Sequence, residues 1–250
     1  MTTYENKLLL ETREDAGTVY QESVQGYARG TRFGEQVVAV LSDEFHSLEG
    51  KCFTATTVLT TGATGTAGHP APVAFEDVKP YLYVKNNNAA GSRIKMQLRH
   101  LCLRYTVIGA GGTLPRWWSG VEPSGTNRYT SGGTQITALP NSRGGSSNTS
   151  NAVIFQGAVV AAAATANMRR IKGGQIRPVI PVIYDELNFN FGTRAGAGAP
   201  SVLSGTLVAA QTIEHPSVIL DPGDQFLLSL WRASQSGADS LELDMSWIER

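Results

Sequence analysis

The last ten residues of the chain alternate between apolar and mostly polar side chains. Such a period of two is typical of a β-strand with one buried and one solvated face. In an α-helix, which has a period of 3.6, the same residues would not gather on one side facing a core. Similar segments recur along the chain, separated by turn residues and without a strand–helix–strand rhythm. We therefore predict an all-β fold, an antiparallel β-sandwich or jelly-roll-like domain with long loops and an extended N-terminal arm. The apolar positions of the last segment are Leu241, Leu243, Met245 and Trp247.

Other segments rich in β-branched and aromatic residues have the same strand character. The 27 glycines and 11 prolines in 250 residues indicate many turns, while 41% apolar residues suffice for one sizeable core. Pro178 and Pro181 bracket a segment typical of an edge strand, and residues 158–166 suit either a short helix or a small-residue strand. The predicted strands span residues 36–41, 52–59, 81–84, 93–108, 212–220, 225–232 and 241–250.

The longest alternating segment, residues 93–108, changes parity in its middle. Apolar side chains stand at positions 94, 96 and 98, and then at 101, 103, 105 and 107. A regular strand would turn its apolar face away from the core at that point, because successive side chains point to opposite faces. One extra residue restores the inward face, so we predict a β-bulge near Arg99 and His100.

Two parts of the chain lack a sustained period. Residues 1–35 are predicted to form an arm that lies over the domain or reaches a neighbouring subunit, with a frayed tail as the alternative. Tyr20, Tyr27 and Phe33 of this arm are candidate interface residues, because aromatic rings need a surface to pack against. The domain, residues 36–250, is predicted to contain a long loop at about 109–151.

Trp117, Trp118 and Tyr129 fall within that predicted loop and are also candidate interface residues. Long loops in compact domains are often binding surfaces, and an adjacent tryptophan pair is a large apolar area that needs a partner. Three interpretations are open: a contact with another subunit or partner, a flap packed on the same domain, and a surface on which carbohydrate stacks.

Motifs for catalysis or metal binding are scarce. No two of the four histidines, at positions 46, 69, 100 and 215, have the spacing that places both imidazoles on one metal ion. No nucleophile elbow, phosphate-binding loop or dinucleotide fingerprint occurs. We therefore predict that the protein is not an enzyme and has no cofactor. The alternative is an enzyme whose reactive groups meet only through folding.

The 21 Lys and Arg residues balance 21 Asp and Glu residues. A chain without net charge has no overall field that attracts phosphate, so we do not expect nucleic acid as a partner. No apolar run is long enough to cross a membrane, and the leucine run at 8–10 is too short for a signal peptide. We expect a protein of the reducing cytoplasm, with Cys52 and Cys102 as buried free thiols.

Two segments near the C-terminus carry a resemblance to a known group of proteins. Residues 217–228 read Ser-Val-Ile-Leu-Asp-Pro-Gly-Asp-Gln-Phe-Leu-Leu, and residues 241–250 read Leu-Glu-Leu-Asp-Met-Ser-Trp-Ile-Glu-Arg. This order of a Pro-Gly turn, an apolar strand, a small-residue hairpin and a final Trp-x-Glu resembles the ending of many structural proteins of tailed bacteriophages. The similarity extends more loosely to residues 81–88 and the strand after them.

The resemblance implies a jelly-roll-type virion subunit, often a homotrimer, without catalytic residues. Such a subunit would be made in the host cytoplasm and would bind copies of itself and the major capsid or other virion proteins. Its place would be that of a capsid decoration or cement protein, a minor capsid protein. The alternative is a neck, tail or fibre component, in which Trp117, Trp118 and Tyr129 would recognise host glycans.

Overall fold

The computed structural model describes residues 29–30, 36–37, 46–47, 49–57, 69–124, 128–139, 145–161, 169–175, 180–192 and 210–250. The chain divides into two compact units, one of residues 1–52 and 141–148 and one of residues 53–140 and 149–250. In the first unit, β1 (Arg29–Gly30) pairs antiparallel with β2 (Gln36–Val37). The rest of the predicted arm, with Tyr20, Tyr27 and Phe33, lies outside the described residues, as do residues 38–41 of the first predicted strand.

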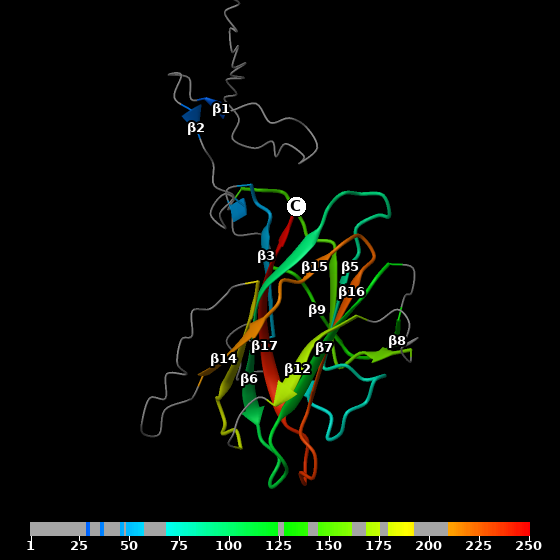
Figure 1. Ribbon diagram of the computed structural model, residues 1–250, viewed down its shortest axis with the longest axis vertical. Coiled ribbons are helices and arrows are strands. Elements are labelled where there is room, and N and C mark those ends of the chain that lie inside the picture. The colour runs from blue at the N-terminus through cyan, green and yellow to red at the C-terminus, as the bar shows by residue number, and fades with distance from the viewer. Residues whose placement is uncertain are drawn as a thin grey trace, which may run out of the picture. The chain divides into compact units, whose positions relative to one another are not determined.

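The second unit consists of two packed β-sheets (Figure 1). The first sheet contains β14 (Ala210–His215), β13 (Glu186–Phe191), β6 (Met96–Val107), β17 (Ser240–Glu249) and β3 (Cys52–Thr56), in that order. The second contains β12 (Arg169–Gln175), β7 (Arg116–Glu122), β16 (Gln225–Trp231), β5 (Leu82–Asn86), β10 (Ala152–Gln156) and β9 (Thr134–Ile136), in that order.

Short strands complete the unit. β4 (His69–Pro70) pairs with β17, and β15 (Ile219–Leu220) pairs with β6. β8 (Tyr129–Ser131) and β11 (Val159–Val160) form a separate antiparallel ribbon. The prediction of an all-β sandwich is confirmed.

The principal strands pair in a nested order. β7 pairs antiparallel with β12, β6 with β13 and β5 with β16, and β3 lies beside β17. Of these four pairs, β7–β12 has the shortest sequence separation, and the other three enclose it one after another in the sequence. This is the jelly-roll arrangement of two Greek keys. β14 is an addition, because it joins the first sheet in parallel with β13.

The predicted bulge in the long strand is confirmed. Leu98 of β6 lies opposite Trp247 of β17, while His100 lies opposite Ser246, so Arg99 is the extra residue. Leu98 and Leu101 are both buried on either side of it. The bulge therefore keeps both halves of β6 facing the core, which fills the space between the sheets, including Phe53 stacked at 6.1 Å on the Trp247 ring.

Three segments differ from the sequence predictions. Residues 109–151 were predicted as one long loop but contain β7, β8 and β9, because turn-forming residues separate short strands there instead of extending one loop. Residues 180–181, the described part of the predicted edge strand between Pro178 and Pro181, lie outside any strand, and residues 178–179 lie outside the described residues. In the Ala-rich segment, Val159–Val160 is a strand, and residues 162–168 lie outside the described residues.

A buried ion pair closes one end of the sandwich. Arg232, after β16, donates from Nε and Nη2 to the Asp239 carboxylate at 2.8 and 2.6 Å. The same guanidinium donates to the carbonyls of Gly109 and Gly111, and the Gly109 amide donates to Asp239 Oδ1. This clamp joins the β6–β7 connection to the β16–β17 connection, and both charged side chains are almost fully buried.

A polar network joins turns at the other end. The Gly223 amide donates to the Asn86 carbonyl at 2.7 Å, and the Asn86 amide donates to the Asp224 carbonyl at 3.1 Å. Asn86 Nδ2 also donates to the carbonyls of Ile94 and Leu220. Gly223 has φ +91°, which favours glycine in this turn. The Asn-rich and Pro-Gly segments of the sequence are therefore two halves of one structural contact.

The clamp predicts an unequal response to two ion-pair deletions. Asp239→Ala leaves the Arg232 guanidinium buried without its carboxylate, which should lower the free energy of unfolding by about 3 to 5 kcal/mol. Glu76→Ala breaks the Glu76–Lys79 pair, whose side chains are 38% and 54% exposed, and should cost less than about 1 kcal/mol. Urea unfolding followed by tryptophan fluorescence measures both; equal losses would contradict the assigned role of the clamp.

Candidate interaction surface

The two adjacent tryptophans lie on opposite faces of one strand. Trp117 points between the sheets, where its ring contacts Phe189 edge-on at 5.1 Å and His215 at 5.9 Å. Trp118 points to the outer face, where Phe75 packs edge-on against it at 6.1 Å. Their exposures are only 4% and 9%. Because consecutive strand residues alternate sides, the pair cannot form one exposed contact surface.

Tyr129 belongs to a third environment. Its ring stacks on Phe155 at 4.4 Å and lies 5.8 Å from Tyr83, in a small apolar cluster beneath the β8–β11 ribbon. The structure therefore does not bring Trp117, Trp118 and Tyr129 together into a carbohydrate-stacking surface. For Trp118, the packed-flap interpretation fits, since Phe75 of the segment before β5 covers it and also contacts Trp231 at 5.1 Å.

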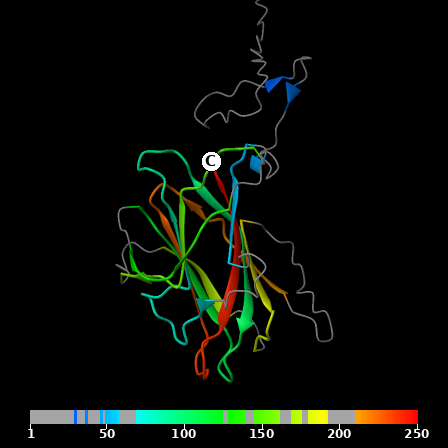
Figure 2. The same cartoon turned by 180° about the vertical axis from the view of Figure 1, so that it is seen from behind.

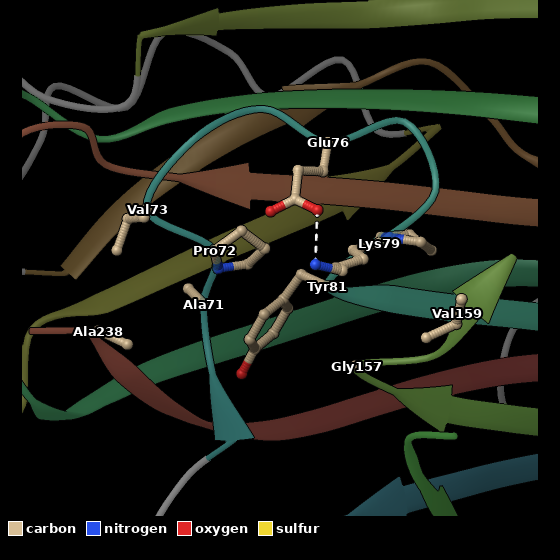
Figure 3. Close-up of a pocket in the computed structure, with 10 residues that line it drawn as sticks. Ala71, Pro72, Val73, Glu76, Lys79, Tyr81, Gly157, Val159 and Ala238 are labelled. Carbon is tan, nitrogen blue, oxygen red and sulfur yellow. Dashed lines mark ion pairs between the residues drawn. The ribbon is translucent and has the colours of Figure 1, made fainter. Parts of the chain in front are cut away.

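A cavity of about 290 Å³ lies between residues 71–81, which include this covering segment, and the Gly157–Val159 and Ala238 positions (Figure 3). Pro72, Val73 and Val159 line it together with the Glu76–Lys79 ion pair. Tyr81 also lines the cavity, but its hydroxyl donates to the Leu241 carbonyl at 2.8 Å, and burial raises its pKa well above the ordinary value. This hydroxyl therefore serves as a structural link between the sheets and is a poor proton donor for chemistry.

A groove of about 380 Å³ lies on the outer face of the first sheet, lined in part by Cys102, Arg104 and Asp244. Arg104 is held by a 2.7 Å ion pair with Glu186. Burial raises the pKa of the Cys102 thiol to about 11, which keeps it protonated and unreactive at neutral pH. Cys102 and Cys52 are free thiols, as predicted, but both are half-buried instead of fully buried.

One buried charge network lies at the end of β7. Arg128 Nε is 3.3 Å from Glu122 Oε2, and its Nη2 is 3.2 Å from Asp77 Oδ2. Burial raises the pKa of Glu122, while Arg128 opposes that shift. Arg128 also donates to the Ala161 carbonyl, so the network fixes the β8–β11 ribbon. Among the described residues, no three His, Cys, Asp or Glu side chains gather in a way that could hold a metal ion.

Among the residues whose exposure the structure gives, the most exposed apolar group is a turn that leads into β13. We call residues 180–184 the apolar turn; Ile180, Val182, Ile183 and Tyr184 in it are 50%, 59%, 50% and 59% exposed. Because about half of each of these four side chains is exposed, together they present an apolar area on the order of 400 Å² to solvent. That is comparable with the largest apolar patch of a typical soluble monomer, and such patches are often interaction sites.

Hydrogen bonds hold the apolar turn in one conformation. Asp185, which is 1% exposed, accepts from the Val182 amide at 2.7 Å through its carboxylate, and its own amide donates to the Val182 carbonyl at 3.0 Å. Tyr105 of β6 exchanges two backbone bonds with the turn, accepting from the Tyr184 amide and donating to the Asp185 carbonyl. The turn is thus anchored to the sheet and presents its side chains in a preorganised way.

Tyr184 adopts a backbone conformation that is unfavourable for its type. Its φ of +72° lies in the left-handed region, which costs a residue with a Cβ atom roughly 1 to 2 kcal/mol. Strained residues cluster at functional sites, where the surrounding structure keeps them in place. The combination of exposure, anchoring and strain makes this turn the best-supported interaction surface among the described residues.

Sequence reasoning did not find this surface. It assigned the Val-Ile segment to an edge strand because prolines flank it, but a strand at a sheet edge should alternate apolar with polar residues. Residues 179–184 read Val-Ile-Pro-Val-Ile-Tyr without such alternation. The unbroken apolar run beside proline was the available signal.

Comparisons with known protein families, curated proteins and solved structures give no match for this chain. Within the described residues, no helix is long and apolar enough to span a membrane.

The left-handed backbone at Tyr184 predicts a difference between two truncations. Tyr184→Gly and Tyr184→Ala remove the same exposed ring, but only glycine adopts a φ of +72° without strain. We expect the glycine variant to be more stable than the alanine variant by about 1 kcal/mol. Thermal unfolding at low protein concentration compares them; an alanine variant of equal or greater stability would show that the turn is not strained.

Proposed function

We propose that this protein is a structural component of a bacteriophage particle, in which it assembles with copies of itself and binds the capsid as a decoration or cement protein. In this proposal its role is structural and not enzymatic, and the favoured oligomer is a homotrimer. The observation that carries the proposal is the anchored apolar turn at residues 180–184.

The apolar turn has the properties of an interface anchor. Binding energy at protein interfaces concentrates in a few apolar and aromatic side chains that become fully desolvated. Because Asp185 and Tyr105 already hold the turn, little conformational entropy is lost when a partner covers it. An exposed apolar area on the order of 400 Å² is about half of what one partner contributes to a standard interface, so surrounding polar residues would supply the rim.

The topology supports the proposal by analogy. Jelly rolls with this nested strand order form viral capsid domains, and also lectins and cupins. A fold alone does not define a function, so the analogy adds weight only together with the exposed turn. The resemblance of residues 217–228 and 241–250 to tailed-phage structural proteins points in the same direction.

The charge balance is compatible with assembly. With 21 basic and 21 acidic residues the chain has no net charge, so copies repel one another little. In a particle, many modest contacts add up, because each further contact of a bound subunit becomes intramolecular. In this proposal, the partners are other copies and a major capsid or other virion protein, and the protein is localised in the virion.

A matched pair of charge insertions tests the proposal. Ile183→Asp places a carboxylate in the apolar turn, whereas Ile219→Asp makes the same change at a comparably exposed position, 43% against 50%. We expect the wild-type protein and the Ile219 variant to be oligomers, and the Ile183 variant to dissociate because burial of a carboxylate is unfavourable. Light scattering over a range of concentrations measures the mass of each.

Two outcomes would contradict the proposal. A wild-type protein that stays monomeric at every concentration would remove its basis, and equal effects of the two variants would remove the role of the turn. Far-UV circular dichroism of all three proteins controls for loss of the β fold.

A further inference from the structure

A second exposed apolar group lies on the segment that leads to β5. Val73 and Phe75 of this segment are 47% and 42% exposed. Val73 also lines the cavity of about 290 Å³. Figure 3 shows Val73 and Ala238 on one side of this cavity and Val159 on the other. We call the cavity together with Val73 and Phe75 the pocket patch.

The size and lining of the cavity suit one large side chain. Its volume is at the lower limit of the pockets that hold small-molecule ligands, which begin at about 300 Å³. Pro72, Val73 and Val159 give it apolar walls. Among the described residues that line it, only Glu76 and Lys79 are charged, and they neutralise each other at 2.7 Å. A side chain with an apolar body and a polar tip would match both the walls and the ion pair.

Tyr184 of the apolar turn is a side chain of this kind. It is 59% exposed, and tyrosine combines a large apolar ring with a hydroxyl that can donate and accept hydrogen bonds. The acidic neighbour Asp185 does not add a charge to this surface, because it is 1% exposed and accepts from the Val182 amide. A contact between the apolar turn and the pocket patch would therefore bury no unpaired charge.

The apolar turn and the pocket patch belong to different sides of the second unit. The turn is bonded to Tyr105 of β6 in the first sheet. Phe75 instead packs on Trp118 and Trp231 of the second sheet. In both views, β13 in yellow and the segment before β5 in cyan lie on opposite sides of the unit (Figures 1 and 2). The turn can therefore meet a pocket patch only on another copy of the chain.

The buried area favours this contact over a contact between two turns. Two apolar turns packed together would bury on the order of 400 Å² per copy, about half of what one partner contributes to a standard interface. In a ring, each copy buries its turn on one neighbour and its pocket patch under the turn of the other, which about doubles that area. Ring closure also makes the last contact intramolecular. A threefold ring requires two different patches on each subunit, whereas a turn-to-turn contact ends at a dimer.

We propose that the apolar turn of one copy docks on the pocket patch of the next copy, with Tyr184 inserted into the cavity, so that identical contacts close a homotrimer. The Tyr184 ring packs against Pro72 and Val73, and its hydroxyl faces the Glu76–Lys79 pair. This inference rests on the proposed function, which it deepens by naming the surface that receives the apolar turn.

Charge insertions in the pocket patch test the pairing. Val73→Asp and Val73→Lys place a charge of either sign beside the cavity. Both should raise the concentration needed for half-maximal association by roughly tenfold or more, because the charge loses its water in the contact. Ile219→Asp is the control at a 43% exposed position outside both patches and should associate like the wild type. Light scattering over a range of concentrations measures the mass, and far-UV circular dichroism checks the fold.

A mixture of two damaged variants separates head-to-tail docking from a turn-to-turn contact. Ile183→Asp keeps an intact pocket patch, and Val73→Asp keeps an intact apolar turn, so only their mixture can form an undamaged contact. We expect dye-labelled Ile183→Asp protein to bind unlabelled Val73→Asp protein in a fluorescence anisotropy titration. The same labelled protein should not bind unlabelled Ile183→Asp protein.

The outcomes distinguish this docking from the proposed function. An oligomeric wild-type protein whose mass is unchanged by both Val73 variants would overturn the docking and leave the proposed assembly in place. Self-association of Val73→Asp protein without binding to Ile183→Asp protein would also overturn the docking and would indicate a turn-to-turn contact. A wild-type protein that is monomeric at every concentration would overturn both.

Discussion

The pairing of β17 with β6 is the contact on which the rest of the structure depends. It joins residues 240–249 to residues 96–107, so that β17 lies inside the first sheet, between β6 and β3. Pairing across such a sequence distance costs loop-closure entropy, which the burial of both inner faces must outweigh. The Arg232–Asp239 clamp lies directly before β17 and fixes where that strand enters the sheet.

Local pattern was sufficient to predict one irregularity and six of the longer strands, because both depend on which side chains face the core; these strands are β3, β5, β6, β14, β16 and β17. It did not predict β7, β10, β12 or β13. The change of parity in residues 93–108 required one extra residue, and Arg99 is that residue. The same reasoning could not give the nested order of the strands. Nothing within β5 specifies that it pairs with β16. Tyr83 and Gln225, which form a hydrogen bond between these strands, are 142 residues apart in the sequence. The partner strand is selected by the packing of the whole sandwich.

Amino-acid composition gave a wrong prediction for residues 109–151, where strands are short and turns are frequent. Trp117 and Trp118 stand among Gly, Ser and Pro residues, so sequence reasoning placed both in one loop and kept a contact surface, a packed flap and a carbohydrate surface as interpretations. In the structure, alternation in β7 buries one ring in the core and the other beneath Phe75. The apolar turn was missed for the converse reason. Its exposure depends on hydrogen bonds from Asp185 and Tyr105, and these are tertiary contacts that no local pattern contains.

The apolar turn depends on the strand that follows it and on the neighbours of that strand. The apolar turn leads directly into β13, and β13 supports β14 through six parallel residue pairs. Loss of β14 would leave β13 held in the first sheet by β6 alone, and the anchoring of the turn passes through the same β6–β13 contact at Tyr105. The presentation of the apolar turn therefore depends on the β6–β13 side of the first sheet.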